Sequence, residues 1–127
     1  MQRTPVHTDR APAAVGPYSQ AIAVDGLLFT SGTIPIDPAT GKIPDGAIED
    51  HAHLVFRNLG AIAEAAGARL ADAVKVTVFL TDMADFQRVN AVYRQYFTEP
   101  YPARSAVQVA ALPLGATIEA EAIIALR

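Results

Sequence analysis

The sequence of 127 residues contains no cysteine, and this absence excludes several kinds of chemistry. A chain without thiols forms no disulfide, offers no thiolate nucleophile, cannot hold zinc through sulfur and cannot sense redox state through cysteine. The composition is compatible with the reducing cytosol, where disulfides are rare. We therefore expect a cytoplasmic protein.

Long apolar runs and basic clusters are missing as well. The first twenty residues lack the apolar segment of a signal peptide, and no stretch approaches the roughly 20 apolar residues of a membrane span. The formal net charge is −3 at pH 7, and the basic residues are scattered along the chain. Nucleic-acid-binding domains usually carry a basic patch. We expect a soluble, unexported protein with no membrane partner, for which RNA is only a secondary hypothesis.

Familiar catalytic and cofactor signatures are also lacking. No G-x-S-x-G nucleophile elbow occurs, and the glycines have neither G-x-G-x-x-G nor Walker spacing. On a helix, His51 and His53 would point about 200° apart, so they cannot chelate one metal ion as an i, i+4 pair can. His7 lies in a lead-in of 15 residues without periodicity, which we expect to be irregular. We expect a protein that needs neither a metal nor a cofactor.

Hydrophobic periodicity predicts five strands and two helices. Asp25-Gly26, between the first two strands, is typical of a type I′ hairpin turn. A helical pattern predicts a first helix that Gly67 ends, and Asp82 is the expected cap of a second helix that Pro100 closes. The expected strands are 18–24, 27–31, 74–80, 105–109 and 117–126, and the expected first helix is 50–66.

The order of these elements, β-β-α-β-α-β-β, predicts a single α+β domain over residues 1–127. Two helices cannot cover both faces of a sheet, so we expect both to pack on one face of a mixed sheet. Apolar side chains would then be left on the other face, and a large exposed apolar patch indicates an interaction surface. We expect a homo-oligomer whose sheets bury one another. The residues expected on that face are Leu28, Phe79, Val107 or Val109, and Ile123.

An arginine and two glutamates lie within otherwise apolar, strand-like sequence near the C-terminus. Arg104 enters its strand after Pro102, and its planar fork of donors matches a carboxylate. Glu119 and Glu121 share one face of the last strand, and a carboxylate in a partly dry site can take a proton from water. Together they suggest a small acidic substrate. The alternative is a solvated rim arginine beside an exposed strand face.

Asn90 lies on the same face of the second helix as Phe86, Tyr93 and Phe97. An amide among aromatic side chains must find hydrogen-bond partners. Asn90 therefore either binds a backbone carbonyl for purely structural reasons or contributes to a site.

Six segments, spread along nearly the whole chain from residue 11 to residue 123, occur in the order found in one known family. They are APAAVGPYSQA, TSGTIP, NLGAIAEAAG, DAVKVTVFLTDMADFQRVNAVYRQYF, PARSAVQVAALP and IEAEAI. They resemble the RidA family, also called the YjgF or L-PSP endoribonuclease-like family. The resemblance implies a chorismate-mutase-like α+β subunit that forms a homotrimer with clefts between subunits. It also implies a cofactor-free enamine/imine deaminase, which converts products of pyridoxal-phosphate enzymes, such as 2-aminoacrylate, to 2-oxo acids and ammonia.

The resemblance also assigns roles to individual residues. Arg104 matches the arginine that grips the substrate carboxylate, and Glu119 matches the glutamate that orients and activates water. Tyr18, Ser31, Gly32 and Asn90 match residues of the cleft, and the backbone of Ala106 lies where the family contacts polar groups of the substrate. The sequence departs from the family at Thr33, where many members have glutamine, and at Ala106, where several bacterial members have cysteine. These departures leave the preferred imine open.

Two other functions are compatible with the sequence. One is a non-catalytic trimer that binds small acids or partner proteins as a regulator, which would keep Arg104 but be indifferent to Glu119. The other is an endoribonuclease or translation inhibitor, a label attached to the family. The negative net charge and the lack of a suitable histidine pair argue against phosphodiester chemistry.

Overall fold

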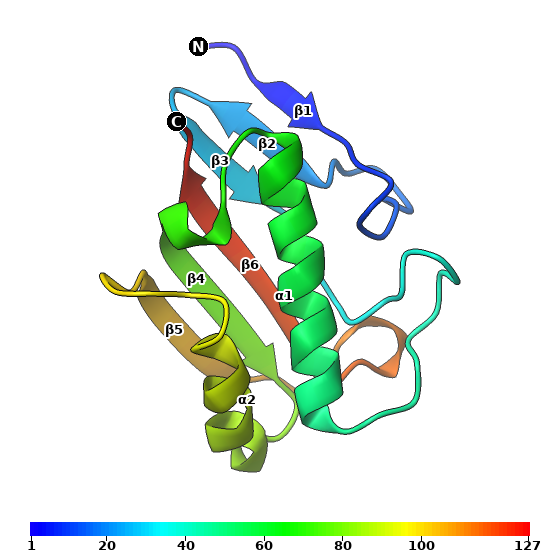
Figure 1. Ribbon diagram of the computed structural model, residues 1–127. Helices are drawn as coiled ribbons and strands as arrows, with labels where there is room; N and C mark the ends of the chain where they lie inside the picture. Colours follow the sequence, from blue (N-terminus) through cyan, green and yellow to red (C-terminus); the bar gives the residue numbers. More distant parts are fainter.

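One mixed β-sheet of six strands organises the chain, and two helices cover one of its faces (Figure 1). The computed structural model describes all residues from 1 to 127. The strands are β1 (Thr4–Val6), β2 (Ala21–Val24), β3 (Leu27–Thr30), β4 (Ala73–Leu80), β5 (Ala103–Gln108) and β6 (Ile118–Ala125). The helices are α1 (Ile48–Ala65) and α2 (Phe86–Tyr93), and short 3₁₀ turns span Leu70–Asp72, Met83–Asp85 and Pro113–Gly115.

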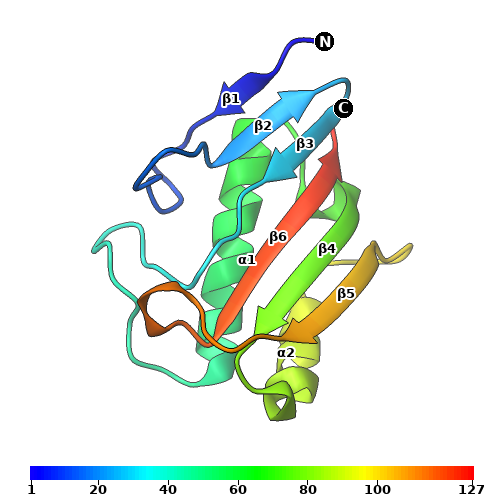
Figure 2. The ribbon, with the colours of Figure 1, turned by 180° about the vertical axis from the view of Figure 1, so that it is seen from behind.

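The strand order β1-β2-β3-β6-β4-β5 places the C-terminal strand in the interior of the sheet. Strands β4 and β5 are parallel, and α2 lies in the crossover that such a pair requires. Every other neighbouring pair is antiparallel. Figure 2 shows the side of the sheet that carries no helix, with α1 and α2 behind the strands. The predicted α+β fold, with a mixed sheet and helices on one face, is confirmed.

The predicted hairpin turn joins β2 to β3. Asp25 has a φ of 49° and Gly26 a φ of 79°, so both central residues adopt the left-handed conformation of a type I′ turn. This turn matches the twist of the two strands and sets their register, in which Val24 pairs with Leu27. The prediction is confirmed.

Helix α1 begins at Ile48, two residues before the expected start, and Gly67 ends it as predicted. The Asp50 carboxylate accepts a hydrogen bond from the N–H of Ala47 at 3.0 Å, so an acid satisfies a free donor at the positive end of the helix. Gly67, with a φ of 80°, ends the helix, and its N–H donates to the carbonyl of Glu64 at 2.9 Å. Between these ends, Phe56 and the other apolar residues of one stripe are buried against the sheet.

Helix α2 is shorter than the periodic pattern indicated. The Asp82 carboxylate accepts from the N–H of Ala84 at 2.9 Å and begins a 3₁₀ turn that runs directly into α2. Of the stripe expected to be buried, Val89, Tyr93 and Phe97 are buried and Phe86 is only partly buried. Because the helix stops at Tyr93, Phe97 lies beyond it but still packs in the core.

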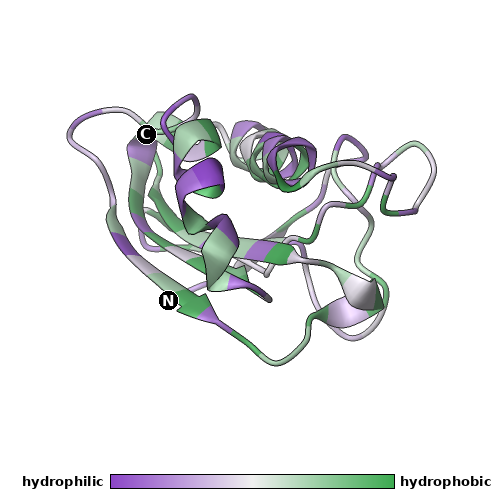
Figure 3. Cartoon of the chain, turned by 90° about the horizontal axis from the view of Figure 1, so that it is seen from below, coloured by the Kyte–Doolittle hydropathy of each residue, from purple (hydrophilic) through white to green (hydrophobic).

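Successive side chains of the central strands point to opposite faces of the sheet, one covered by the helices and one uncovered. One set lies between the sheet and the helices and forms the core. Figure 3 shows both helices on the same side of the sheet. On the other side Phe29 and Val107 are each 40% exposed, and Phe79 and Ile123 are partly buried. The core residues of β4 and β6 are Val76, Val78, Leu80, Ile118, Ala120, Ala122 and Ile124.

The structure corrects the expected position of Leu28. This residue is fully buried on the helix side, where it pairs with Ile124, and its neighbours Leu27 and Phe29 occupy the uncovered face. All the residues of β3 except Thr30 are apolar, so alternation could not show which face each one takes.

The N-terminal lead-in also differs from the prediction. Residues Thr4–Val6 form edge strand β1, in which Thr4 pairs with Ala23 of β2. A strand of three residues with Pro5 at its centre shows no usable alternation, and an edge strand tolerates proline because one side of it needs no ladder partner. Strand β2 begins at Ala21 and not at residue 18, because Tyr18 belongs to a turn in which its N–H donates to Gly16.

No helix has both the length and the apolar composition required to cross a bilayer.

Candidate active site

Glu119 lies at the start of β6, beside the segment where the chain leaves β3. It lines a cavity of about 530 Å³ together with three of the other predicted site residues. Those residues are Tyr18, Ser31 and Gly32. Thr33 is buried in the same wall and is held by two backbone hydrogen bonds with Ala120, of 2.8 and 3.1 Å. The structure therefore brings together one half of the predicted site.

The segment that carries Tyr18 is fastened to the sheet by polar side chains. Ser31 donates its hydroxyl to the carbonyl of Ser19 at 2.6 Å. Gln20 is only 5% exposed; its oxygen accepts from the N–H of Thr8 at 2.7 Å, and its amide donates to the carbonyls of Thr8 and Pro12 at 3.0 and 2.8 Å. Sequence reasoning missed this role of Gln20. An amide at the entrance to an apolar strand was the available signal, because such a group must find partners.

Gly32 provides space for the Glu119 carboxylate. A Cβ atom at position 32 would lie 2.8 Å from the Glu119 Cδ and would overlap its Oε1 oxygen. The backbone of Gly32 is not left-handed, so the requirement is for room and not for conformation. Any larger residue at this position must displace the glutamate.

The Glu119 carboxyl has a pKa above its usual value. Burial is the main cause, because it disfavours the charged form, and the nearby Glu121 carboxylate raises the pKa further. Glu121 itself is exposed, two residues further along the same face of β6. A carboxylate with a raised pKa accepts a proton more readily, which suits a group that must remove a proton from water.

Arg104 lies on β5 in a second cavity, of about 320 Å³. Its Nη1 donates to the Oδ1 of Asn90 at 2.7 Å, which is the only hydrogen bond of the Arg104 side chain. Arg104 makes no ion pair with any carboxylate of the chain. The side chain of Asn90 is thus engaged by Arg104, and not by a backbone carbonyl. The cavity is lined by Asn90, Tyr93, Arg94, Tyr101, Pro102 and Arg104.

Within one chain the two halves of the site face in opposite directions. Arg104 is opposite Val76, on the side that packs against the helices, whereas Glu119 is opposite Phe79, on the uncovered side. Ala106 lies on the helix side with Arg104 and is partly buried. The sequence did not predict this division, which depends on the pairing of strands distant in sequence.

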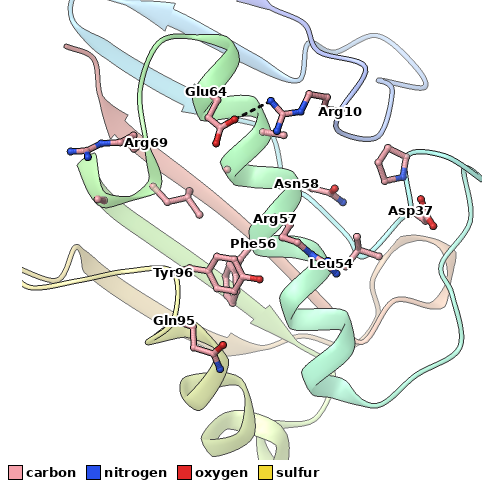
Figure 4. Close-up of a pocket in the computed structure, with 15 residues that line it drawn as sticks. Arg10, Asp37, Leu54, Phe56, Arg57, Asn58, Glu64, Arg69, Gln95 and Tyr96 are labelled. Atoms are coloured by element: carbon pink, nitrogen blue, oxygen red, sulfur yellow. Dashed lines mark hydrogen bonds and ion pairs between the residues drawn. The ribbon is translucent and has the colours of Figure 1, made fainter.

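A larger cavity, of about 730 Å³, lies over the outer surface of α1 (Figure 4). It contains none of the predicted site residues. Arg10 donates to Glu64 at 3.0 Å, so these two charges are paired, and Figure 4 shows Arg69 and Asp37 on either side of the helix. Because its polar groups do not converge on one point, we do not consider it the active site.

The three histidines make local contacts. His51 is hydrogen-bonded to the carbonyl of Pro44 at 2.8 Å, and His53 to the hydroxyl of Tyr96 at 2.9 Å. His7 pairs with Asp9 at 3.0 Å on the surface. No group of three histidine, aspartate or glutamate side chains is placed to hold a metal ion.

Comparison with known proteins identifies the family. The model of the family described as Endoribonuclease L-PSP matches residues 8–126. The chain is 53% identical over 122 residues to the RutC family protein y4sK of Sinorhizobium fredii, an alignment that covers 96% of this chain and 97% of that protein. It is 46% identical over 121 residues to the human 2-iminobutanoate/2-iminopropanoate deaminase, covering 95% and 88% of the two chains.

A solved structure agrees with these relatives. The structure of E. coli TdcF with bound serine superposes with a TM-score of 0.91 at 44% identity and covers 98% of this chain and 99% of that one. The matches extend over nearly the whole length of both proteins, as the six sequence segments do. The chain therefore belongs to the RidA/YjgF, or L-PSP endoribonuclease-like, family.

Proposed function

We propose that this protein is an enamine/imine deaminase that hydrolyses reactive 2-imino and 2-enamino acids to 2-oxo acids and ammonia. The observation that carries the proposal is a pair of complementary groups: the Arg104 guanidinium, which has no acidic partner, and the Glu119 carboxylate, whose pKa is raised. The name of the human relative supports the same reaction, and the serine bound to TdcF supports a site for small amino acids.

We infer that the two halves of the site meet between subunits of a homotrimer with chorismate-mutase-like architecture. Arg104 and Glu119 face opposite sides of one sheet, so a substrate that touches both needs a second copy of the chain. The uncovered face, where Phe29 and Val107 are 40% exposed, offers apolar area for the assembly. In this arrangement Arg104 faces the partner subunit's Glu119 across a cleft.

The proposed reaction needs no cofactor. The Arg104 guanidinium binds the substrate carboxylate through two parallel hydrogen bonds and so fixes the C=N carbon in the cleft. Glu119 takes a proton from water while the oxygen adds to that carbon, and it passes this proton to the imine nitrogen. Glu119 then moves the hydroxyl proton of the carbinolamine to its nitrogen, and ammonia leaves as the C–N bond breaks and a C=O bond forms. An enamine such as 2-aminoacrylate first gains a proton on its terminal carbon and loses one from its nitrogen to become the imine.

The remaining residues of the site have supporting roles in this proposal. Tyr18 and Ser31 line the Glu119 cavity and can contact the reacting nitrogen and oxygen, and Gly32 leaves room for the carboxylate. The backbone of Ala106 lies two residues beyond Arg104 on the same face of β5 and is available to polar groups of the substrate. We expect the protein to act in the cytoplasm on products of pyridoxal-phosphate enzymes.

A coupled assay tests the proposal directly. A serine or threonine dehydratase generates 2-aminoacrylate, and release of pyruvate is followed with and without this protein. We expect acceleration by the wild type and little by the Glu119→Gln variant. Binding of small acids without acceleration would favour a regulatory trimer, and cleavage of a labelled RNA by the wild type alone would favour the endoribonuclease.

A further inference from the structure

The Arg104 guanidinium lies over the faces of two aromatic rings. Its Cζ atom is 4.7 Å from the centroid of the Tyr93 ring and 5.3 Å from that of Phe86, both within the range of a cation–π interaction. We propose that Phe86 and Tyr93 form an aromatic cradle that, with Asn90, holds Arg104 in the orientation needed to grip a carboxylate. The proposal rests on the proposed function, and it makes the two rings positioning residues.

The sequence places the cradle on one element. Phe86, Asn90 and Tyr93 are spaced i, i+4 and i+7 along α2, so they lie on one face of that helix. That face meets β5, where Arg104 is on the helix side of the sheet. A single helical stripe thus supplies two ring faces and one amide to the same guanidinium.

Aromatic rings suit this arginine better than an acidic partner would. A carboxylate beside Arg104 would occupy the fork that the substrate needs and would offset its charge. A ring face attracts the cation but accepts no conventional hydrogen bond from it. Arg104 has five N–H donors and uses one of them on Asn90, so its other donors have no partner within the chain. The cradle therefore fixes the position of the guanidinium while its remaining N–H donors stay free to bind a carboxylate.

The surrounding core fixes the Tyr93 ring in turn. It stacks on Phe97 with centroids 4.3 Å apart and meets Phe56 edge-on at 5.7 Å. Tyr93 is only 4% exposed, and its buried hydroxyl has no hydrogen-bond partner. The hydroxyl therefore contributes no hydrogen bond to the fold, which indicates that the ring is the part that matters. Phe86, by contrast, is only partly buried, so it can be changed at lower cost to the core.

The test measures binding of pyruvate, a stable 2-oxo acid, by calorimetry, and kcat and KM in the imine assay. We expect Phe86→Leu to weaken pyruvate binding about three- to tenfold, the range of a partly exposed cation–π contact, and to raise KM more than it lowers kcat. Phe86→Trp should restore binding. Tyr93→Phe keeps the ring face and should stay within about twofold of the wild type, whereas Tyr93→Leu should lose affinity as Phe86→Leu does.

Two controls separate the cradle from general damage to the fold. Tyr96→Leu removes a ring from the same aromatic cluster that does not lie over Arg104, so it should lower thermal stability without changing pyruvate affinity. In an Arg104→Ala background, Phe86→Leu should have no further effect on binding, because the cation is gone.

The proposal is overturned if Phe86→Leu binds pyruvate as the wild type does, if the wild type does not bind pyruvate, or if Tyr93→Phe loses as much affinity as Tyr93→Leu. The last result would assign the role to the hydroxyl. If the wild type hydrolyses imines and Phe86→Leu leaves pyruvate affinity unchanged, only the cradle is rejected. A wild type that binds pyruvate through the cradle without hydrolysing imines rejects the deaminase alone.

Discussion

At the scale of single residues, the proposed reaction depends most on the geometry of Arg104. We predict that Arg104→Lys loses most of the deaminase activity and most of the affinity for 2-oxo acids, although the charge is kept. A lysine ammonium is a point charge and cannot reproduce two parallel hydrogen bonds to a carboxylate. Steady-state kinetics and calorimetry measure the effect, and circular dichroism should show an unchanged fold. A lysine variant with near wild-type efficiency would mean that the carboxylate binds elsewhere.

The two glutamates of β6 should differ in the same assay. Glu119→Gln keeps the shape of the side chain but removes the base, so turnover should fall by about 10² to 10⁴. In the wild type, kcat/KM should fall as the pH drops through the raised pKa of Glu119. Glu121→Gln removes a charge that raises this pKa. The fall of kcat/KM in acid should therefore occur at lower pH in this variant, while turnover at neutral pH changes little. An inactive Glu121→Gln trimer beside an active Glu119→Gln trimer would reverse the assignment.

The same raised pKa sets the sign of the effect on stability. The folded state holds the Glu119 proton more tightly than the unfolded state. Protonation of Glu119 therefore contributes fully to the stability of the fold at pH values below the pKa that this group has in the unfolded chain. This contribution is lost as the pH rises through the folded pKa. Glu119→Gln should therefore be more stable than the wild type at neutral pH, and the difference should shrink in acid. Denaturant midpoints across this pH range provide the measurement.

The candidate residues could be proposed from the sequence, whereas several of their contacts could not be predicted. Arg104 and Glu119 stand out because charge is rare in apolar strand sequence, and the family motif assigns them roles. The contact of Asn90 with Arg104 and the four hydrogen bonds of the Gln20 side chain depend on which segments pack together. No local pattern encodes that information.

At the scale of secondary-structure elements, prediction succeeded where local chemistry decides. Asp25-Gly26 can form a type I′ turn wherever two strands flank it, and Gly67 ends α1 because it adopts a left-handed conformation at little cost. Prediction failed at β1, where Pro5 and a length of three residues hide the strand, and pairing with β2 supplies the missing information. Leu28 was assigned to the wrong face because its strand is almost uniformly apolar.

The junction of β3 and β6 gives a prediction at this scale. Gly32→Ala places a methyl group against the Glu119 carboxylate, so we expect activity to fall at least tenfold, the effect of about 1.4 kcal/mol on the barrier, while the fold persists. Gly60→Ala in α1 is the matched control: its new methyl meets Leu70 at an ordinary 3.6 Å, and loss of a helical glycine should stabilise the protein by about 0.5–1 kcal/mol. Kinetics and chemical denaturation compare the two variants. Full activity in Gly32→Ala would show that Glu119 can move without consequence.

At the scale of the whole molecule, the number of helices predicted that one face of the sheet is uncovered, and the structure confirms that both helices lie on the other face (Figure 2). We predict that the uncovered face is buried by assembly into a trimer. Sedimentation should give three times the chain mass of 13.4 kDa. Val107→Asp would bury an unpaired charge between subunits, so it should dissociate the trimer and abolish activity together. A wild type that stays monomeric at micromolar concentration would remove the basis for a shared cleft.

The sequence could not show that Arg104 and Glu119 lie on opposite faces of one subunit. That fact follows from the register of β4 with β5 and with β6, which are brought together from distant parts of the chain. In the proposed mechanism catalysis therefore depends on assembly, because a substrate that contacts both residues needs two subunits.

Complementation between two inactive variants is the most direct test of the shared site. Arg104→Ala and Glu119→Gln chains are mixed by co-expression, and pyruvate release from 2-aminoacrylate is measured for trimers shown by mass spectrometry to contain both. A mixed ring has one cleft of three with an intact arginine and an intact glutamate, so mixed trimers should show about a third of the wild-type activity, and an unseparated random mixture about a quarter. Mixed trimers as inactive as either parent would contradict a site built from two subunits.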